Sequence, residues 1–169
     1  GRLMGAIASP SVTRYTGTDP CTPTMDGLER MARDHAHRTG TDVHLHRIGS
    51  EDFRPMPETV DLCFTSPPYF NTEMYSDESS QSWVRYPTVD EWNDQFLRTT
   101  IANCRQALVP DGTLILNVAD VKSHPSLVVD TITIAQEEGF IFTETLRLAL
   151  SSISSGGHKY EPVLIFQKA

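Results

Sequence analysis

Asp61-Leu62-Cys63-Phe64-Thr65-Ser66-Pro67-Pro68-Tyr69-Phe70 is the stretch around which this chain is organised. Its first half continues an apolar run that begins at Val60, and such a run is typical of a strand buried on both faces. The two prolines end the strand, because proline has no N–H for a sheet ladder and fixes its own φ at about −65°. Each also favours extended geometry in the residue before it. The sequence therefore predicts a rigid loop at the carboxyl end of a buried strand, the edge where ligands bind in open α/β sheets.

The composition is that of an ordinary globular protein. The chain has 169 residues, of which 38% are hydrophobic and 21% charged, so we expect one domain with a substantial core. We see no secretory signal and no apolar run near the roughly 20 residues that span a bilayer. Three cysteines without metal-ligand spacing (Cys21, Cys63 and Cys104) fit a reducing compartment, so a cytoplasmic location without membrane contact is expected.

The net charge of the chain is −8. Proteins that bind nucleic acid over a wide surface usually carry a positive net charge. If nucleic acid is the substrate, this chain alone is expected to bind it weakly. Most of the binding would then come from a local positively charged patch or from a part of the protein outside this chain.

Helical and strand patterns alternate along the chain. The expected helices cover 1–9, 24–37, 88–108 and 123–138, and the expected strands cover 14–19, 42–48, 60–64, 113–118, 140–150 and 160–167. This alternation predicts an α/β fold with a mainly parallel sheet and helices on both faces. The glycine- and serine-rich segment 151–157, flexible by composition, joins the last two strands without a helix, so an antiparallel hairpin is expected. Segment 71–87 is polar with scattered aromatic residues and is expected to be a surface excursion.

Polar residues follow three of the expected strands. Asp19 follows the first, Ser50-Glu51-Asp52 the second, and Ser66 the third. The carboxyl ends of parallel strands lie along one rim of a doubly wound sheet. Asp19 comes 18 positions after Gly1, close to the spacing at which an acid after a glycine-rich turn grips ribose hydroxyls. The pattern predicts a cofactor containing adenosine that lies across this rim.

Thr65-Ser66-Pro67-Pro68-Tyr69, placed after an apolar strand, is similar to the (D/N/S)PP(Y/F/W) motif of one enzyme family. In this respect the sequence resembles the DNA amino-methyltransferases, which use S-adenosylmethionine to methylate N4 of cytosine or N6 of adenine. Four further segments are similar to the family's ribose strand, its adenine-contacting turn, the entry to its fifth strand and its last strand: 15–19, 49–52, 108–117 and 160–166. The resemblance thus covers nearly the whole chain.

The resemblance implies a Rossmann-like, class I methyltransferase fold whose first strand and first glycines would precede Gly1. It implies a cofactor-binding half in 1–58 and a catalytic half in 59–169, with no separate target-recognition domain within the chain. The residues expected to hold S-adenosylmethionine are Gly1, Asp19, Pro20, Ser50, Glu51, Asp52 and Thr65, with Asp52 favoured over Glu51 as the contact to adenine. No metal is expected, because the six histidines lack a third partner at fixed spacing.

The resemblance also implies how the proline loop works. The Ser66 oxygen and the Pro67 carbonyl would accept the two hydrogens of an exocyclic amine and aim its lone pair at the methyl group. Pro67 and Pro68 would keep these acceptors still, which is electrostatic preorganisation combined with orientation. Tyr69 and Phe70 would stack on the base, and Asn71 follows as a candidate substrate contact. The base must first leave the duplex.

Ser66 stands where adenine enzymes of the family more often carry aspartate, which favours N4 of cytosine over N6 of adenine as the acceptor. Methylation of RNA or of a protein glutamine, and a non-catalytic binding subunit with this fold, are the alternatives. The expected partner is double-stranded DNA, with a possible separate target-recognition region or subunit. A bacterial or phage-encoded restriction-modification protein is the expected setting.

Overall fold

The computed structural model describes residues 1–150 and 159–169. Its strands are Arg14–Thr18 (β1), Asp42–His46 (β2), Val60–Thr65 (β3), Leu108–Asn117 (β4), Phe140–Leu150 (β5) and Lys159–Lys168 (β6). Its α-helices are Arg2–Ala8 (α1), Thr22–His35 (α2), Ser82–Arg85 (α3), Val89–Glu91 (α4), Thr99–Ala107 (α5) and Leu127–Glu137 (α6). A 3-10 turn, Ala36–Arg38, extends α2, and a π-helical segment, Trp92–Arg98, joins α4 to α5.

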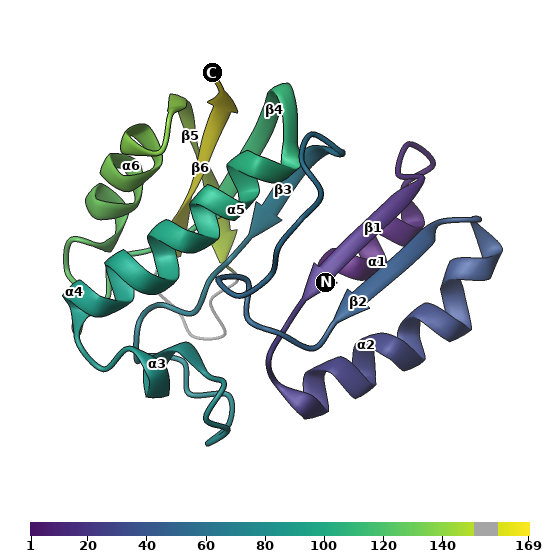
Figure 1. The fold of residues 1–169 in the computed structure, drawn as a ribbon, viewed down its shortest axis with the longest axis horizontal. Coiled ribbons are helices and arrows are strands. Elements are labelled where there is room, and N and C mark those ends of the chain that lie inside the picture. Colours follow the sequence, from purple (N-terminus) through teal and green to yellow (C-terminus); the bar gives the residue numbers. More distant parts are fainter. Residues whose placement is uncertain (151–158) are drawn as a thin grey trace.

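The strands form two sheets (Figure 1). One is the parallel pair β1–β2, and the other has the order β3-β4-β6-β5. The pair β3–β4 is parallel, whereas β6 runs antiparallel to both β4 and β5. The expected antiparallel hairpin of the last two strands is therefore confirmed. Segment 151–157, expected to be flexible, lies outside the described residues, and a strand before Gly1 stays a prediction.

The long helical segment after the excursion begins where the sequence indicates. Thr88 forms a capping box with Glu91, in which each side chain bonds the other residue's backbone N–H. Trp92, Phe96 and Ile101 from the segment's apolar stripe are buried in the core. The next helix starts later than expected, because α6 begins at Leu127 rather than beside Ser123.

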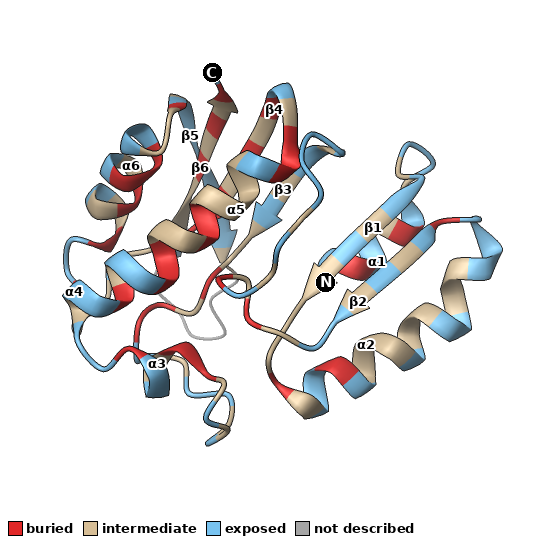
Figure 2. Ribbon diagram, in the orientation of Figure 1, coloured by how far each residue is buried: buried red, intermediate tan, exposed pale blue. Residues whose placement is uncertain are grey.

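The core lies between the four-stranded sheet and the helices α5 and α6 (Figure 2). Leu114 and Leu116 on β4, with Leu164 and Phe166 on β6, are fully shielded from solvent. These residues sit at alternate positions and face the same side of the sheet. The core that supports the loop after β3 therefore lies mainly on one face of the four-stranded sheet.

The prediction that β3 is covered on both faces is wrong. Cys63 faces α5, where its thiol approaches the Cys104 carbonyl, but Leu62 and Phe64 on the opposite face are 52% and 48% exposed. The start of α1 approaches that face, where the Arg2 guanidinium lies 5.9 Å from the centre of the Phe64 ring. A continuous apolar run marks a strand's hydrophobicity but not which of its faces a helix covers.

Candidate active site at the carboxyl ends of three strands

A cavity of about 240 Å³ lies where β1, β2 and β3 end. Thr18 and Asp19 reach it from the end of β1, Gly49 to Glu51 from the turn after β2, and Thr65 to Pro68 from β3 and the proline loop. Parallel strands deliver their carboxyl ends to one edge, so residues far apart in sequence meet there. The rim expected from the sequence therefore exists as one cavity.

Asp19 is half-buried at the β1 end of the cavity. Its Oδ1 accepts a 2.8 Å hydrogen bond from the backbone N–H of Cys21, which fixes the carboxylate at the entrance to α2. Burial raises the pKa of the Asp19 carboxyl above its ordinary range, and the bond from Cys21 and the nearby Arg2 charge offset part of that rise. The group is thus a fixed acceptor of the kind that a ribose hydroxyl requires.

Glu51 is the buried acid of the turn after β2, with 3% of its surface exposed. Its Oε1 accepts a 2.6 Å hydrogen bond from Arg85, while its Oε2 is buried without a partner. Burial raises the pKa of this carboxyl. The carboxylate folds over Gly49, where a Cβ would lie 2.7 Å from the Glu51 carboxyl carbon. Glycine at position 49 therefore makes room for the acid.

The structure favours Glu51 over Asp52 as the acid that faces the cavity. Asp52 is exposed and lies outside the lining, where its carboxylate pairs with Arg85. Gly1 and Asn71 also lie outside the lining, although Arg2 belongs to it. Pro20 and Ser50 line the cavity as expected, and the Ser50 hydroxyl is fixed by a 2.8 Å hydrogen bond with Thr100 on α5.

The proline loop forms the third wall. Ser66 is half-buried, and Pro67 is buried against the cavity. Backbone bonds from Phe70 N–H to the Pro68 carbonyl, 2.9 Å, and from Thr72 N–H to the Tyr69 carbonyl, 3.1 Å, tighten the chain after the prolines. The prediction that the strand ends at the prolines is confirmed, and the rigidity of the loop stays a prediction.

Tyr69 and Phe70 point away from the cavity. Phe70 has a φ of 53° and is 5% exposed, and its ring makes edge contacts with Trp92 and His124. The left-handed turn costs a bulky residue about 1–2 kcal/mol and is held here by core packing. This placement is at odds with the expected stacking of Phe70 on a base. Tyr69 is also buried, with its hydroxyl bonded to Glu161 on β6 at 3.2 Å.

Segment 73–86, part of the expected surface excursion 71–87, forms a strap across the cavity. The Glu78 carboxylate accepts from Thr22 N–H at the start of α2, 3.1 Å, and the Ser80 hydroxyl donates to the Pro20 carbonyl, 3.4 Å. Arg85 forms ion pairs with Glu51 and Asp52. Tyr75 and Gln81 line the cavity, and the Gln81 Nε2 is buried without a partner. Sequence reasoning missed Glu78, Ser80, Gln81 and Arg85, because only the polar, Ser- and Glu-rich composition marks the strap.

The cavity residues fit a cofactor that contains adenosine. Two polar atoms of residues that line the cavity, Glu51 Oε2 and Gln81 Nε2, are buried and have no hydrogen-bond partner in the protein. Glycine at position 49 gives the Glu51 carboxylate the space that a Cβ would take. Together with Asp19, these groups suit a ribose and an adenine edge. Within the described residues, no group of three His, Cys, Asp or Glu side chains could hold a metal ion.

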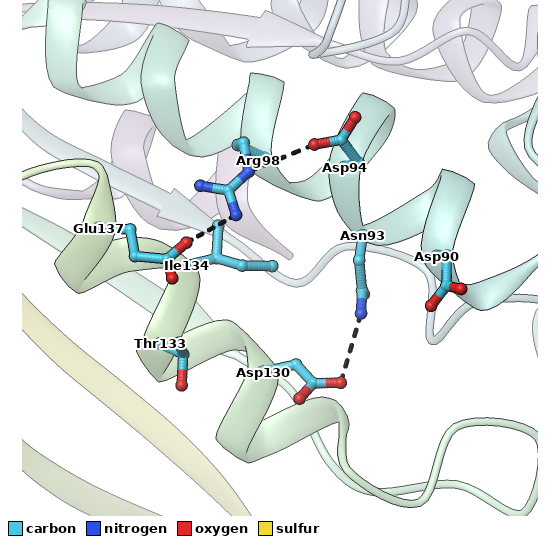
Figure 3. Close-up of a pocket in the computed structure, with 8 residues that line it drawn as sticks. All are labelled: Asp90, Asn93, Asp94, Arg98, Asp130, Thr133, Ile134 and Glu137. Atoms are coloured by element: carbon cyan, nitrogen blue, oxygen red, sulfur yellow. Dashed lines mark hydrogen bonds and ion pairs between the residues drawn. The ribbon is translucent and has the colours of Figure 1, made fainter.

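A second hollow, of about 340 Å³, lies between the π-helical segment and α6 (Figure 3). Arg98 occupies it and pairs with Asp94 and Glu137, while Asn93 donates to Asp130 (Figure 3). Its other lining residues are Asp90, Thr133 and Ile134. Arg98 pairs with carboxylates in this hollow, and none of its lining residues comes from the ends of β1, β2 or β3, so we assign the site to the smaller cavity.

No helix in the described part of the chain is long and apolar enough to cross a membrane.

No curated protein matches the sequence significantly. Two solved structures are similar in fold. One is a SAM-dependent methyltransferase from Methanosarcina mazei, with 13% identity, a TM-score of 0.65, and 99% of this chain and 86% of that chain covered. The other is the N-methyltransferase NodS from Bradyrhizobium japonicum, with 17% identity, a TM-score of 0.61, and coverages of 96% and 80%.

These likenesses establish the class I methyltransferase fold of the chain. The sequence profile of the N6/N4 DNA methylases matches residues 60–169, which include β3, the proline loop and all that follows. That match spans more than half of the chain. The chain therefore belongs to the N6/N4 DNA methylase family, whose methyl donor is S-adenosylmethionine.

Proposed function

We propose that the protein transfers a methyl group from S-adenosylmethionine to the exocyclic amine of a base flipped out of DNA, with N4 of cytosine as the preferred acceptor. The observation that carries the proposal is that Ser66 and Pro67 line the same cavity as Asp19 and Glu51. Groups suited to adenosine and groups suited to an amine thus share one small space. Transfer requires such proximity between donor and acceptor.

Each half of the cavity has a proposed task. Asp19, with Pro20 beside it, holds the ribose, and Glu51 with Ser50 holds the adenine side. Thr65 at the end of β3 borders the methionine side. The Ser66 oxygen and the Pro67 carbonyl accept the amine hydrogens, and Pro68 keeps the loop in place. S-adenosylmethionine supplies the electrophilic methyl group when bound. An amine nitrogen whose hydrogens are both held presents its lone pair in one direction only.

The preference for cytosine rests on Ser66. A neutral hydroxyl in place of the aspartate more frequent in adenine enzymes of this family favours N4 of cytosine, and N6 of adenine is the second candidate. DNA is the proposed partner, and the charge of −8 supports a target-recognition part outside these 169 residues.

The test uses the full-length protein, tritiated S-adenosylmethionine and unmethylated genomic DNA, followed by digestion to nucleosides. Label in N4-methylcytosine supports the proposal, and label in N6-methyladenine supports the second candidate. Absence of label in DNA, together with absence of S-adenosylhomocysteine binding by calorimetry, contradicts both. Ser66→Ala should lower turnover more than cofactor affinity, and Asp19→Ala should lower cofactor affinity more than turnover at saturating cofactor. The reverse pattern would contradict the assigned roles.

A further inference from the structure

Arg2, the first residue of α1, brings a positive charge to the cavity. Among the described residues that line the cavity, it is the single basic residue, and Asp19 and Glu51 are the acidic ones. Within residues 1–150 and 159–169, Arg2 forms no ion pair, although Glu51 is paired with Arg85. The described part of the protein thus leaves the Arg2 charge free to pair with an anion in the cavity.

The neighbours of Arg2 place its guanidinium on the side of the cavity formed by β3. The guanidinium lies 5.9 Å from the centre of the Phe64 ring, within the range of a cation–π contact. Phe64 directly precedes Thr65, the residue assigned to the methionine side of the cofactor. The Arg2 charge also acts on Asp19 at the end of β1, where it opposes the rise in the pKa of that carboxyl. Arg2 therefore borders the space next to the proposed ribose contact.

The charges of S-adenosylmethionine call for one cation in such a site. Its sulfonium and α-ammonium groups are positive, and the α-carboxylate of its methionyl chain is its one negative group. The two acids that line the cavity would repel this carboxylate, so a position beside a positive charge is favoured. A guanidinium presents N–H donors in a planar fork that matches the two oxygens of a carboxylate. Arg2 is the lining residue with this chemistry.

We propose that Arg2 binds the α-carboxylate of the methionyl chain and thereby selects a cofactor that carries this group. Asp19 at one end of the cavity and Ser66 at the other then hold the ribose and the amine, and Arg2 holds the chain that leaves the sulfur between them. Adenosine derivatives without the carboxylate lose this contact. The inference rests on the proposed function, because it requires S-adenosylmethionine to bind in this cavity.

The exposure of Arg2 limits how much this contact contributes. Arg2 is exposed in the protein, and an exposed ion pair between flexible side chains adds little to stability. Two features raise its contribution here. The Phe64 ring restricts the guanidinium to the side of β3, which lowers the entropy lost when it binds. A paired guanidinium and carboxylate can also form two parallel charge-assisted hydrogen bonds. We therefore expect an effect of about tenfold on affinity.

The experiment measures, by calorimetry on the full-length protein, the affinity for two ligands that differ only in the carboxylate. They are S-adenosylhomocysteine and its decarboxylated analogue, which keeps the ammonium group. The variants are Arg2→Gln, which removes the charge, and Arg2→Lys, which keeps the charge without the planar fork. Arg14→Gln is the matched control, because Arg14 is an exposed arginine on β1 that lies outside the cavity lining. The melting temperature of each variant without ligand is measured alongside.

Arg2→Gln is expected to lower the affinity for S-adenosylhomocysteine by about tenfold and to leave the affinity for the decarboxylated analogue unchanged. The wild type should bind the analogue about tenfold more weakly than S-adenosylhomocysteine, whereas Arg2→Gln should bind the two alike. Arg2→Lys should recover part of the loss, and Arg14→Gln should match the wild type. Equal losses for both ligands in Arg2→Gln, or wild-type affinity for S-adenosylhomocysteine, overturn the role of Arg2.

The wild-type measurements separate this inference from the proposed function. If the wild type binds neither ligand, the proposed function fails, and the role of Arg2 fails with it. If the wild type binds S-adenosylhomocysteine and Arg2→Gln behaves as Arg14→Gln does, the role of Arg2 alone fails. Should Arg2→Gln not fold, the wild type carries the test with the two ligands. Equal affinity of the wild type for both ligands then overturns the inference.

Discussion

Arg85 on α3 donates a 2.6 Å hydrogen bond to Oε1 of Glu51, the buried acid of the turn after β2. The same guanidinium pairs with both oxygens of Asp52. Its own side chain is 30% exposed, whereas that of Glu51 is 3% exposed. One arginine from the strap thus neutralises a carboxylate that burial would otherwise disfavour, and it closes the strap onto the cofactor end of the cavity.

Arg85→Ala should therefore destabilise the protein by about 1–3 kcal/mol, because it leaves Glu51 buried without its partner. It should also weaken binding of S-adenosylhomocysteine, because the strap loses its hold on the turn. Arg98→Ala is the matched control. Arg98 also binds several carboxylates, but their side chains are 25–74% exposed, so its loss should cost under about 1 kcal/mol. Chemical denaturation and calorimetry check both effects, and equal losses in the two variants would contradict the prediction.

Gly49→Ala should abolish or strongly weaken cofactor binding. A Cβ at position 49 would lie 2.7 Å from the carboxyl carbon of Glu51, so the acid must leave its place over the glycine. Gly27→Ala, in the middle of α2, is the control, since a Cβ there meets no atom within 4 Å. Alanine should stabilise that helix by up to about 1 kcal/mol. If calorimetry shows that Gly49→Ala binds S-adenosylhomocysteine as tightly as the wild type, the assignment of Glu51 as a cofactor contact is contradicted.

Cofactor affinity should fall as the pH is lowered from neutral into the mildly acidic range. Burial raises the pKa of Asp19, so its carboxylate takes up a proton at a higher pH than an ordinary aspartate does. The ionised form accepts hydrogen bonds from ribose, so affinity is full above this raised pKa and is lost below it. Asp19→Asn should bind more weakly at neutral pH and show a flatter pH profile. Titrations across this range check the prediction, and parallel profiles for the two proteins would contradict it.

Phe70→Ala should destabilise the fold by about 3–5 kcal/mol, because it empties a place in the core between Trp92 and His124. Its exposed neighbour provides the control, since Asn71→Ala should change stability by less than about 0.5 kcal/mol. Thermal unfolding measures both. If Phe70→Ala keeps its stability but loses affinity for DNA, the aromatic ring serves the substrate and the core assignment is wrong.

Local sequence patterns were enough for the order of the strands and for the place of the cavity at their carboxyl ends. The apolar run before Ser66 predicts β3, and the two prolines predict where it stops, because both effects depend only on neighbouring residues. The rule that parallel strands share a carboxyl edge then brings Asp19, the turn after β2 and Ser66 to one cavity. Of these, Ser66 lies within residues 60–169, the segment that matches the DNA methylases.

The tertiary structure decided which side chains act together. Nothing local distinguishes Glu51 from Asp52, and only the packing of the strap buries the first and leaves the second outside. Phe70 turns into the core because a positive φ redirects the chain, which no motif encodes. Arg85 meets Glu51 across 34 positions, and Tyr69 meets Glu161 across 92. Such contacts depend on how whole elements pack against one another. The sequence by itself thus determined which residues gather at the carboxyl ends of the strands, and the fold determined which distant residues pair with them and cover the cavity.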